Sequence, residues 1–323
     1  MRDELAQRIR WRRVGPFRVS SELFLDIVFT AACDCVCPWC IARTAEYARE
    51  DREAWRQALA EAFEIFDIRS VVILGGEATQ DPDFFDKLAA VEAVIRKHPV
   101  QHLILTTNGV RLRDPAFAQA LVKTDIDAVN LSRMHWDQAA NDAVFGRQTP
   151  TRDQIRALHD RLATAGKTLR LNVNVWRGNL DSVGEMTRFV EAFAGCCDAI
   201  KFTPLMRTDM FGTVPAVTAY AAGHAIDEAG IAALWDAMAA RHRLVDRAKG
   251  VLGFVDYAEL EACGQRVILK YAQVEDKYDR DTVIPTLKLY PNGCLSNEWS
   301  FRRDIRARLS DGHSPAKGSI TGP

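Results

Sequence analysis

Residues 33–40, with the sequence CDCVCPWC, place four cysteines within one short stretch. They are Cys33, Cys35, Cys37 and Cys40, and the whole chain of 323 residues has eight cysteines. Thiols crowded into one segment of a long chain indicate metal binding rather than a network of disulfides. This stretch therefore predicts a metal-binding loop.

The spacing of the thiols separates three ligands from one bystander. Cys33, Cys37 and Cys40 have the spacing C-x3-C-x2-C, which suits an iron–sulfur cluster, whereas Cys35 falls outside it. Three thiolates on a four-iron cluster leave one iron open for a substrate or cofactor, which is typical of a catalytic metal. Four thiolates could instead close a structural zinc site, although such sites usually pair two separate ligand elements. A non-catalytic iron–sulfur or zinc-binding structural protein therefore stays open as an alternative.

The chain around the cysteine stretch alternates strand and helix patterns. Short apolar runs predict six strands, at 23–30, 70–76, 102–109, 127–132, 169–176 and 198–206. Helical spacing of apolar residues predicts helices at 51–66, 81–98, 114–122, 151–165 and 181–194. The alternation predicts an α/β fold of parallel βα units, with the active face at the carboxyl ends of the strands. The cysteines lie on that face, because they follow the first strand.

The cysteine motif resembles the signature of the radical S-adenosylmethionine (SAM) superfamily, which has C-x3-C-x2-C after the first strand. An aromatic residue precedes the last cysteine of that signature, and Trp39 occupies this position. The segment GGEA at 75–78 resembles the Gly-Gly-Glu-Pro segment of the family, with Ala in place of Pro. The resemblance implies that the backbone at Gly75, Gly76 and Glu77 receives the amino group of the SAM methionine.

Further cofactor-binding residues follow from the same resemblance. The chain is most similar to the molybdenum-cofactor biosynthesis protein A type of radical SAM enzyme, on 129–148 and 171–186. The residues implied to contact SAM are Asn108 in TTNG, Ser132, Asn172 and Arg147, the last of these through the SAM carboxylate. The cofactors implied are a [4Fe-4S] cluster and SAM, and the electron comes from an external reductant such as flavodoxin or ferredoxin.

The resemblance also implies a domain organisation. Residues 23–206 are expected to form a partial (β/α)6 TIM-like barrel, preceded by an N-terminal extension at 1–22. Residues 207–323 are expected to form a short α+β extension that caps the substrate and carries no auxiliary cluster. Within it, the sequence predicts a loop at 207–226, a helix at 227–242 and a hairpin at 286–299 turning at Pro291-Asn292-Gly293.

The implied reaction begins with reductive cleavage of SAM to a 5′-deoxyadenosyl radical, which abstracts hydrogen from a substrate carbon. Past residue 206 only Cys263 and Cys294 remain, too few for an auxiliary cluster, which favours a redox-neutral outcome. A first strand near residue 23 leaves no peptide-recognition domain before it, which favours a small-molecule substrate over a peptide.

A sugar or sugar-nucleoside of natural-product biosynthesis is the expected substrate. The narrower hypothesis is decarboxylation of a glycosyl-uronate nucleoside, since the layout resembles that of cytosylglucuronate decarboxylase, with Lys201 or Arg207 holding the carboxylate. The alternative is a sugar or aminoglycoside epimerase in which Cys263 or Cys294 returns the hydrogen. Cys196 and Cys197 are expected to pack in the core.

The charge balance argues against two classes of partner. Lys plus Arg number 42 and Asp plus Glu number 43, so nothing points to nucleic acid or an acidic membrane surface. The first residues lack the apolar segment of a secretory signal, and no apolar run has membrane-spanning length. The chain is expected to be soluble and cytoplasmic.

Overall fold

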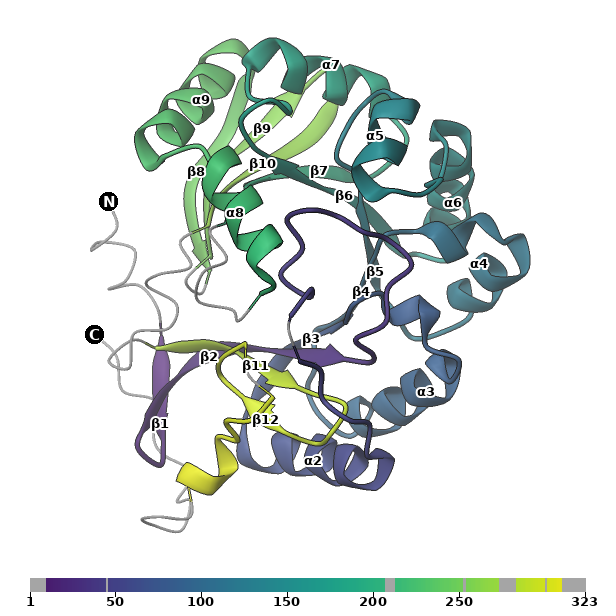
Figure 1. Ribbon diagram of the computed structural model, residues 1–323, viewed down its shortest axis with the longest axis vertical. Coiled ribbons are helices and arrows are strands. Elements are labelled where there is room, and N and C mark those ends of the chain that lie inside the picture. Colours follow the sequence, from purple (N-terminus) through teal and green to yellow (C-terminus); the bar gives the residue numbers. More distant parts are fainter. Residues whose placement is uncertain are drawn as a thin grey trace.

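The computed structural model describes residues 10–44, 46–206, 213–251, 254–272, 283–299 and 301–309. Their strands form one sheet, with the order β12-β11-β2-β3-β4-β5-β6-β7-β10-β9-β8, and β1 pairs with β2 (Figure 1). The strands are β1 (Trp11–Val14), β2 (Phe17–Val28), β3 (Ile68–Leu74), β4 (His102–Thr107), β5 (Ala128–Ser132), β6 (Thr168–Val175), β7 (Ala199–Pro204), β8 (Arg243–Val251), β9 (Phe254–Ala262), β10 (Gln265–Ala272), β11 (Ile284–Leu289) and β12 (Leu295–Ser296).

Strands β2 to β7 pair in parallel and in chain order, and helices follow them on the outside of the curved sheet (Figure 1). The helices are α2 (Arg52–Ile65), α3 (Phe84–Ile95), α4 (Pro115–Val122), α5 (Gln138–Phe145), α6 (Arg152–Thr164), α7 (Val183–Phe193), α8 (Pro215–His224) and α9 (Glu228–Arg241). Several begin at a side-chain cap, such as Asp51 before α2 and Thr151 in a capping box before α6. The expected α/β partial barrel is confirmed.

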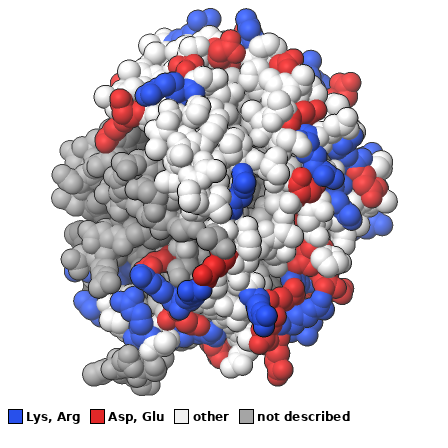
Figure 2. Space-filling model, viewed as in Figure 1, with Lys and Arg blue, Asp and Glu red and all other residues white. Residues whose placement is uncertain are grey.

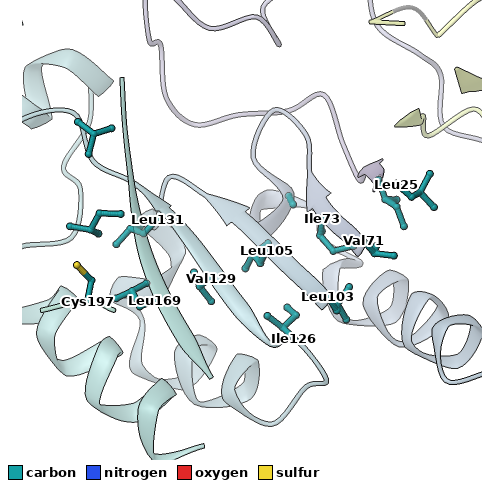
Figure 3. Close-up of a cluster of buried hydrophobic side chains, with 14 of the residues drawn as sticks. Leu25, Val71, Ile73, Leu103, Leu105, Ile126, Val129, Leu131, Leu169 and Cys197 are labelled. Atoms are coloured by element: carbon teal, nitrogen blue, oxygen red, sulfur yellow. The ribbon is translucent and has the colours of Figure 1, made fainter. Parts of the chain in front are cut away.

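The core lies between the sheet and these helices (Figure 3). Leu25, Val71 and Leu103 are register partners on neighbouring strands, and Val129 pairs with Leu169 in the same way. All five side chains are buried, and burying each stabilises the fold by about 1.5–3 kcal/mol. Cys196 and Cys197 are buried in this layer, which confirms their assignment to the core.

The first barrel strand begins earlier than the sequence predicted. β2 starts at Phe17, not near residue 23, and pairs antiparallel with β1 through a tight turn in which Gly15 has φ 55°. This hairpin was not predicted, because the prediction of the strand was based on the apolar run at 23–30. Residues 17–22 are polar on one side and do not continue that run. Residues 10–22 therefore extend the sheet at the amino end of its first barrel strand, β2.

The C-terminal part extends the barrel on both sides. β11 pairs in parallel with β2, and β10 pairs in parallel with β7, so two strands from beyond residue 206 widen the set of six. β8 and β9 then continue antiparallel beyond β10. In the part of the chain that the structure describes, β10 and β11 do not pair with each other, and the barrel stays open.

The C-terminal part contains two elements that the sequence predicted and one helix that it did not. The helix at 227–242 is confirmed by α9, and the hairpin at 286–299 by β11 and β12, with Gly293 at φ 77° in its turn. The loop predicted at 207–226 is wrong from Pro215 onward, because α8 occupies that segment; its many small residues gave no amphipathic pattern. No helix among the described residues is long and apolar enough to cross a membrane.

Candidate active site

The cysteine loop, which we define as residues 29–51 between β2 and α2, crosses the mouth of the barrel at the carboxyl ends of the strands, with α8 beside it (Figure 1). Most of the charged side chains on this face lie towards its periphery, and its centre is largely uncharged (Figure 2). A cavity of about 250 Å³ lies under the loop, and we call it the cysteine cavity. Its walls include Cys33, Cys35, Cys37, Trp39 and Cys40 from the loop, and Gly75, Gly76, Glu77, Thr106, Thr107, Asn108, Ser132, Asn174 and Thr203 from the strand ends.

The three thiols of the C-x3-C-x2-C motif face this one cavity. Burial raises the pKa of the Cys37 thiol, and the neighbouring Cys40 and Cys33 thiols raise it further. Burial likewise raises the pKa of Cys40. Three thiols that line one cavity fit a [4Fe-4S] cluster that keeps one iron open, and a bound metal would hold them as thiolates.

Cys35 has a different environment. Its Sγ, the Cys33 Sγ and an Asp34 carboxylate oxygen lie within 4.8 Å of one another. Asn108 Nδ2 donates to Asp34 Oδ1 at 2.8 Å and to Cys35 Sγ at 3.1 Å. Cys35 therefore lines the cavity with partners of its own, and its exclusion from the cluster remains a prediction from spacing.

Gly75 and Gly76 are required by the approach of two backbones. Gly76 N donates to Thr30 O at 2.7 Å, which ties the end of β3 to the start of the cysteine loop. A Cβ at Gly76 would lie 2.4 Å from the carbonyl oxygens of both Ala31 and Ala32, and one at Gly75 would lie 2.4 Å from Thr30 O. The two glycines thus allow the backbone of the cysteine loop to pack closely against the end of β3. Their contact with SAM remains a prediction.

Gly76→Ala is expected to lower the free energy of unfolding by about 1–3 kcal/mol, because backbone atoms must move to admit the methyl group. The iron content after reconstitution should fall with it, since the displaced backbone leads into Cys33. Gly223→Ala in α8 is the matched control, because no atom lies within 4 Å of its added Cβ. Equal iron content in the two variants would contradict the assignment.

Glu77 orders the segments that follow β3 and β4, because its buried carboxyl group accepts hydrogen bonds from both. Its Oε1 accepts from Thr79 N at 3.1 Å, Thr79 Oγ1 at 2.6 Å and Thr107 Oγ1 at 2.7 Å. Its Oε2 accepts from Asn108 N at 2.6 Å, so the carboxyl group joins the ends of β3 and β4. Burial raises the pKa of Glu77, and these hydrogen bonds oppose that shift.

Arg147 forms a different contact from the one expected. Its Nε lies 3.2 Å from Asp34 Oδ2, which also accepts from Gln80 Nε2 at 2.9 Å. The guanidinium therefore pairs with the cysteine loop, and contact with a SAM carboxylate would require it to leave Asp34. That contact remains a prediction.

Near the end of β6, a residue that the sequence did not predict as a cofactor contact lines the cysteine cavity. Ser132 lines the cysteine cavity, as does Asn174, whereas Asn172 does not. Side chains two residues apart share a face of a strand, so Asn172 lies below Asn174 inside the barrel. The alternation in LNVNVW could have placed both amides on one face, with the one nearer the strand end at the cavity.

The predicted substrate residues are scattered. Lys201 shares the inner face of β7 with Thr203, which lines the cysteine cavity. Cys294 is buried against Val28 and Tyr290, near the same end of the barrel. Arg207 lies outside the described residues.

Cys263 is misplaced for the role predicted for it. It is exposed in the turn between β9 and β10, with φ 53°. The neighbouring Arg266 pairs with Ala199 at the amino end of β7, the end opposite the cysteine loop. A hydrogen donor to a substrate beside the cluster cannot act from there, and the expectation for Cys263 is corrected.

An aromatic cluster covers the cysteine loop. The Trp39 ring packs on Trp176 at 4.6 Å between centroids and on Phe145 at 6.4 Å. Tyr220 of α8 lies 6.3 Å from Trp39 and stacks on His224 at 4.0 Å. Trp39, which the motif predicted beside SAM, lines the cysteine cavity and also anchors the loop to α8, a helix the sequence did not reveal.

Comparison with known proteins adds the family. The sequence model described as the Radical SAM superfamily matches residues 27–190, just over half of the chain. The chain belongs to the radical SAM superfamily. Its enzymes use a [4Fe-4S] cluster and SAM and need an electron donor, and the three cysteines of the motif are present here.

Individual relatives of this radical SAM protein are distant. GTP 3′,8-cyclase of Rhodobacter capsulatus is 26% identical over 248 residues, 76% of this chain and 69% of that protein. PqqA peptide cyclase of Streptomyces rochei is 29% identical over 166 residues, 50% of this chain and 42% of that protein. Streptococcus suis SuiB bound to its precursor peptide SuiA has a TM-score of 0.59 at 17% identity, over 89% of this chain and 64% of SuiB. The last likeness concerns the fold alone.

Proposed function

We propose that this radical SAM enzyme acts on a small, polar, anionic substrate, and that the substrate is a glycosyl-uronate nucleoside that loses its carboxylate as CO₂. The net change replaces the carboxylate by hydrogen with uptake of one proton, so no external oxidant is consumed. The observation that carries the proposal is the polar inner face of the barrel below the cysteine cavity.

Two amide oxygens on that inner face lack a hydrogen-bond partner in the part of the chain that the structure describes. The Oδ1 atoms of Asn130 on β5 and Asn172 on β6 are buried, with no hydrogen-bond partner among the described residues. Asn130 Nδ2 does have one, Thr106 Oγ1 at 3.3 Å. An orphaned buried acceptor costs about 1–3 kcal/mol, which a ligand donor would recover. The hydroxyl groups of a sugar are donors of the right kind.

A cation lies beside these amides. Lys201 is the register partner of Asn172 on the neighbouring strand, and both face the barrel interior. An ammonium group there favours an anionic substrate and would hold its carboxylate in one orientation. Proposed roles follow: Lys201 positions the carboxylate, Asn130 and Asn172 position the sugar ring, and Ser132 contacts SAM.

When bound and reduced, the cluster and SAM supply the 5′-deoxyadenosyl radical that abstracts hydrogen. The proposed ligands are Cys33, Cys37 and Cys40, with the electron delivered from outside by a flavodoxin or ferredoxin. The chain itself holds the substrate carbon beside the cysteine cavity and excludes water. Residues beyond 206 are proposed to cap that cavity, since α8 packs on the cysteine loop through Tyr220.

The relatives support parts of this proposal. GTP 3′,8-cyclase, whose name gives a nucleotide as its substrate, aligns over 76% of this chain. That likeness favours a nucleoside. The match to PqqA peptide cyclase covers 50% of this chain and gives weaker support to a peptide substrate.

Epimerisation is a second candidate, favoured by the position of Cys294. This buried thiol packs against Val28 and Tyr290 at the cysteine-loop end of the barrel, and burial raises its pKa to about 12. A neutral thiol is the form that donates a hydrogen atom. Cys294→Ala tests this: retained CO₂ release from a uronate would eliminate the epimerase.

Lys201→Gln tests the main proposal. The reconstituted enzyme, given SAM, a reductant and a cytosine glycosyl-uronate, should release CO₂ at least about 10-fold more slowly in this variant, because it loses the half-buried charge that is proposed to hold the carboxylate. SAM cleavage without substrate should be unchanged. Lys97→Gln, at an exposed site on the outer surface, is the control. Equal CO₂ release by the two variants would refute the role of Lys201.

A further inference from the structure

A second cavity borders the cysteine cavity at the β11–β2 side of the barrel. Its volume is about 330 Å³, within the range of small-ligand sites. Ile41, Leu74, Gly75 and Gly76 line both cavities, so one thin wall separates them. A molecule in the second cavity would therefore lie beside whatever fills the first.

Four aromatic residues contribute to the walls of this second cavity, which we call the aromatic cavity. Tyr290, Trp299 and Phe301 come from the C-terminal hairpin and the segment after it, and Tyr47 comes from the end of the cysteine loop. The rings of Tyr290 and Phe301 lie 6.2 Å apart at 64°. β11 brings this set to the barrel mouth because it pairs in parallel with β2.

One ion pair lies in the lining of the aromatic cavity, and the buried Lys288 lies outside the lining against the Trp299 ring. Lys288 Nζ, on a side chain only 1% exposed, lies 4.5 Å from the centroid of the Trp299 ring and 3.8 Å from Asp26 Oδ2. Glu46 and Arg302, both in the lining, form an ion pair. The lining is thus mostly apolar and includes four aromatic rings, with the buried Lys288 amino group against one of them.

We propose that the aromatic cavity binds the planar heteroaromatic base of a nucleoside substrate, with Trp299 as its main stacking partner. The inference rests on the proposed function, in which the sugar and carboxylate of the substrate lie beneath the adjacent cysteine cavity. Flat rings stack on aromatic side chains regardless of base identity, which suits a cavity with four aromatic residues in its lining. A cavity of this size accepts a base more readily than an extended peptide.

The lining residues of the two cavities indicate different ligands for each. The cysteine cavity holds the cluster thiols and so takes the methionine part of SAM, whereas the aromatic cavity has no thiol in its lining. The C-terminal hairpin, which lies outside the segment matched to the family, would then help to hold the base.

Binding of cytidine and of guanosine to the reconstituted enzyme tests this, with saturating S-adenosylhomocysteine present to fill the SAM site. Isothermal titration should show saturable binding of at least one nucleoside, weakened about 10-fold or more in Trp299→Ala and largely kept in Trp299→Phe. Tyr47→Ala, at a side chain half exposed, is a second variant that should weaken binding without disturbing the core. Affinity for S-adenosylhomocysteine should stay unchanged in all three and serves as the check on folding.

Several results would overturn the inference. Failure of both nucleosides to bind the unaltered enzyme would do so, as would competition with S-adenosylhomocysteine or unchanged affinity in both Trp299→Ala and Tyr47→Ala. Binding of an aromatic dipeptide in place of nucleosides would point to a peptide substrate instead. The result is separable from the proposed decarboxylation: nucleoside binding that depends on Trp299, without CO₂ release from any uronate, would keep this site and remove that reaction.

Discussion

Cys37→Ala is expected to lose the cluster and to lower SAM cleavage by more than about 100-fold, whereas Cys35→Ala should keep both. The two thiols are two residues apart and both line the cysteine cavity, so the pair is a closely matched comparison. The difference lies in their partners. Both thiols lie near Cys33, but Cys35 also interacts with Asn108 and Asp34, whereas Cys37 lies near Cys40.

Iron and sulfide analysis after anaerobic reconstitution, the spectrum of the reduced protein and the yield of 5′-deoxyadenosine measure this directly. Loss of iron from Cys35→Ala as well as Cys37→Ala would indicate four-thiolate ligation, and with no 5′-deoxyadenosine it would favour a structural metal site. Cluster retention in Cys37→Ala would refute the three-ligand assignment.

Glu77→Gln is expected to destabilise the protein by about 2–4 kcal/mol. The carboxylate accepts three hydrogen bonds at one oxygen and one from Asn108 N at the other. An amide of the same size can satisfy only one of these two sides, since its NH₂ group would face a donor. The misfit should also weaken SAM binding, because Asn108 and the glycines beside Glu77 line the cysteine cavity.

The urea midpoint of the reconstituted protein, measured anaerobically, would show this loss of stability. Glu64→Gln, on the exposed side of α2, is the control and should change stability by no more than about 0.5 kcal/mol. A Glu77→Gln variant as stable as Glu64→Gln would mean that the hydroxyl groups of Thr79 and Thr107 rotate to accept the amide, and that Glu77 is not needed to order the loop.

Much of the barrel could be predicted because its signals are local. Fully buried parallel strands give apolar runs such as SVVILGG, and helical spacing of apolar residues marks helices such as those at 51–66 and 151–165. The cysteine spacing is local too, since all three proposed ligands lie within eight residues. These features depend on short stretches of chain, so the sequence alone located them.

Contacts between distant segments could not be predicted in the same way. Nothing in LKLY indicates that β11 pairs with β2, or that Trp299 would meet Lys288 at the barrel mouth. The error at Cys263 has the same origin, because sequence position does not say at which end of the barrel a hairpin turn lies. The helix α8 was missed because its small residues carry no apolar period.

CDCVCPWC, with the βα alternation around it, determined by sequence alone that this chain is an α/β protein with a cluster-binding loop, since ligand spacing and strand periodicity are properties of adjacent residues. Only the tertiary structure decided what surrounds that loop: Gly75 and Gly76 fitted against its backbone, Glu77 buried beneath it, and an aromatic cavity built from a hairpin more than 200 residues later. Those features come from the curvature of the sheet and from the pairing of β11 with β2, which bring together backbones and rings whose separation along the chain leaves no local trace.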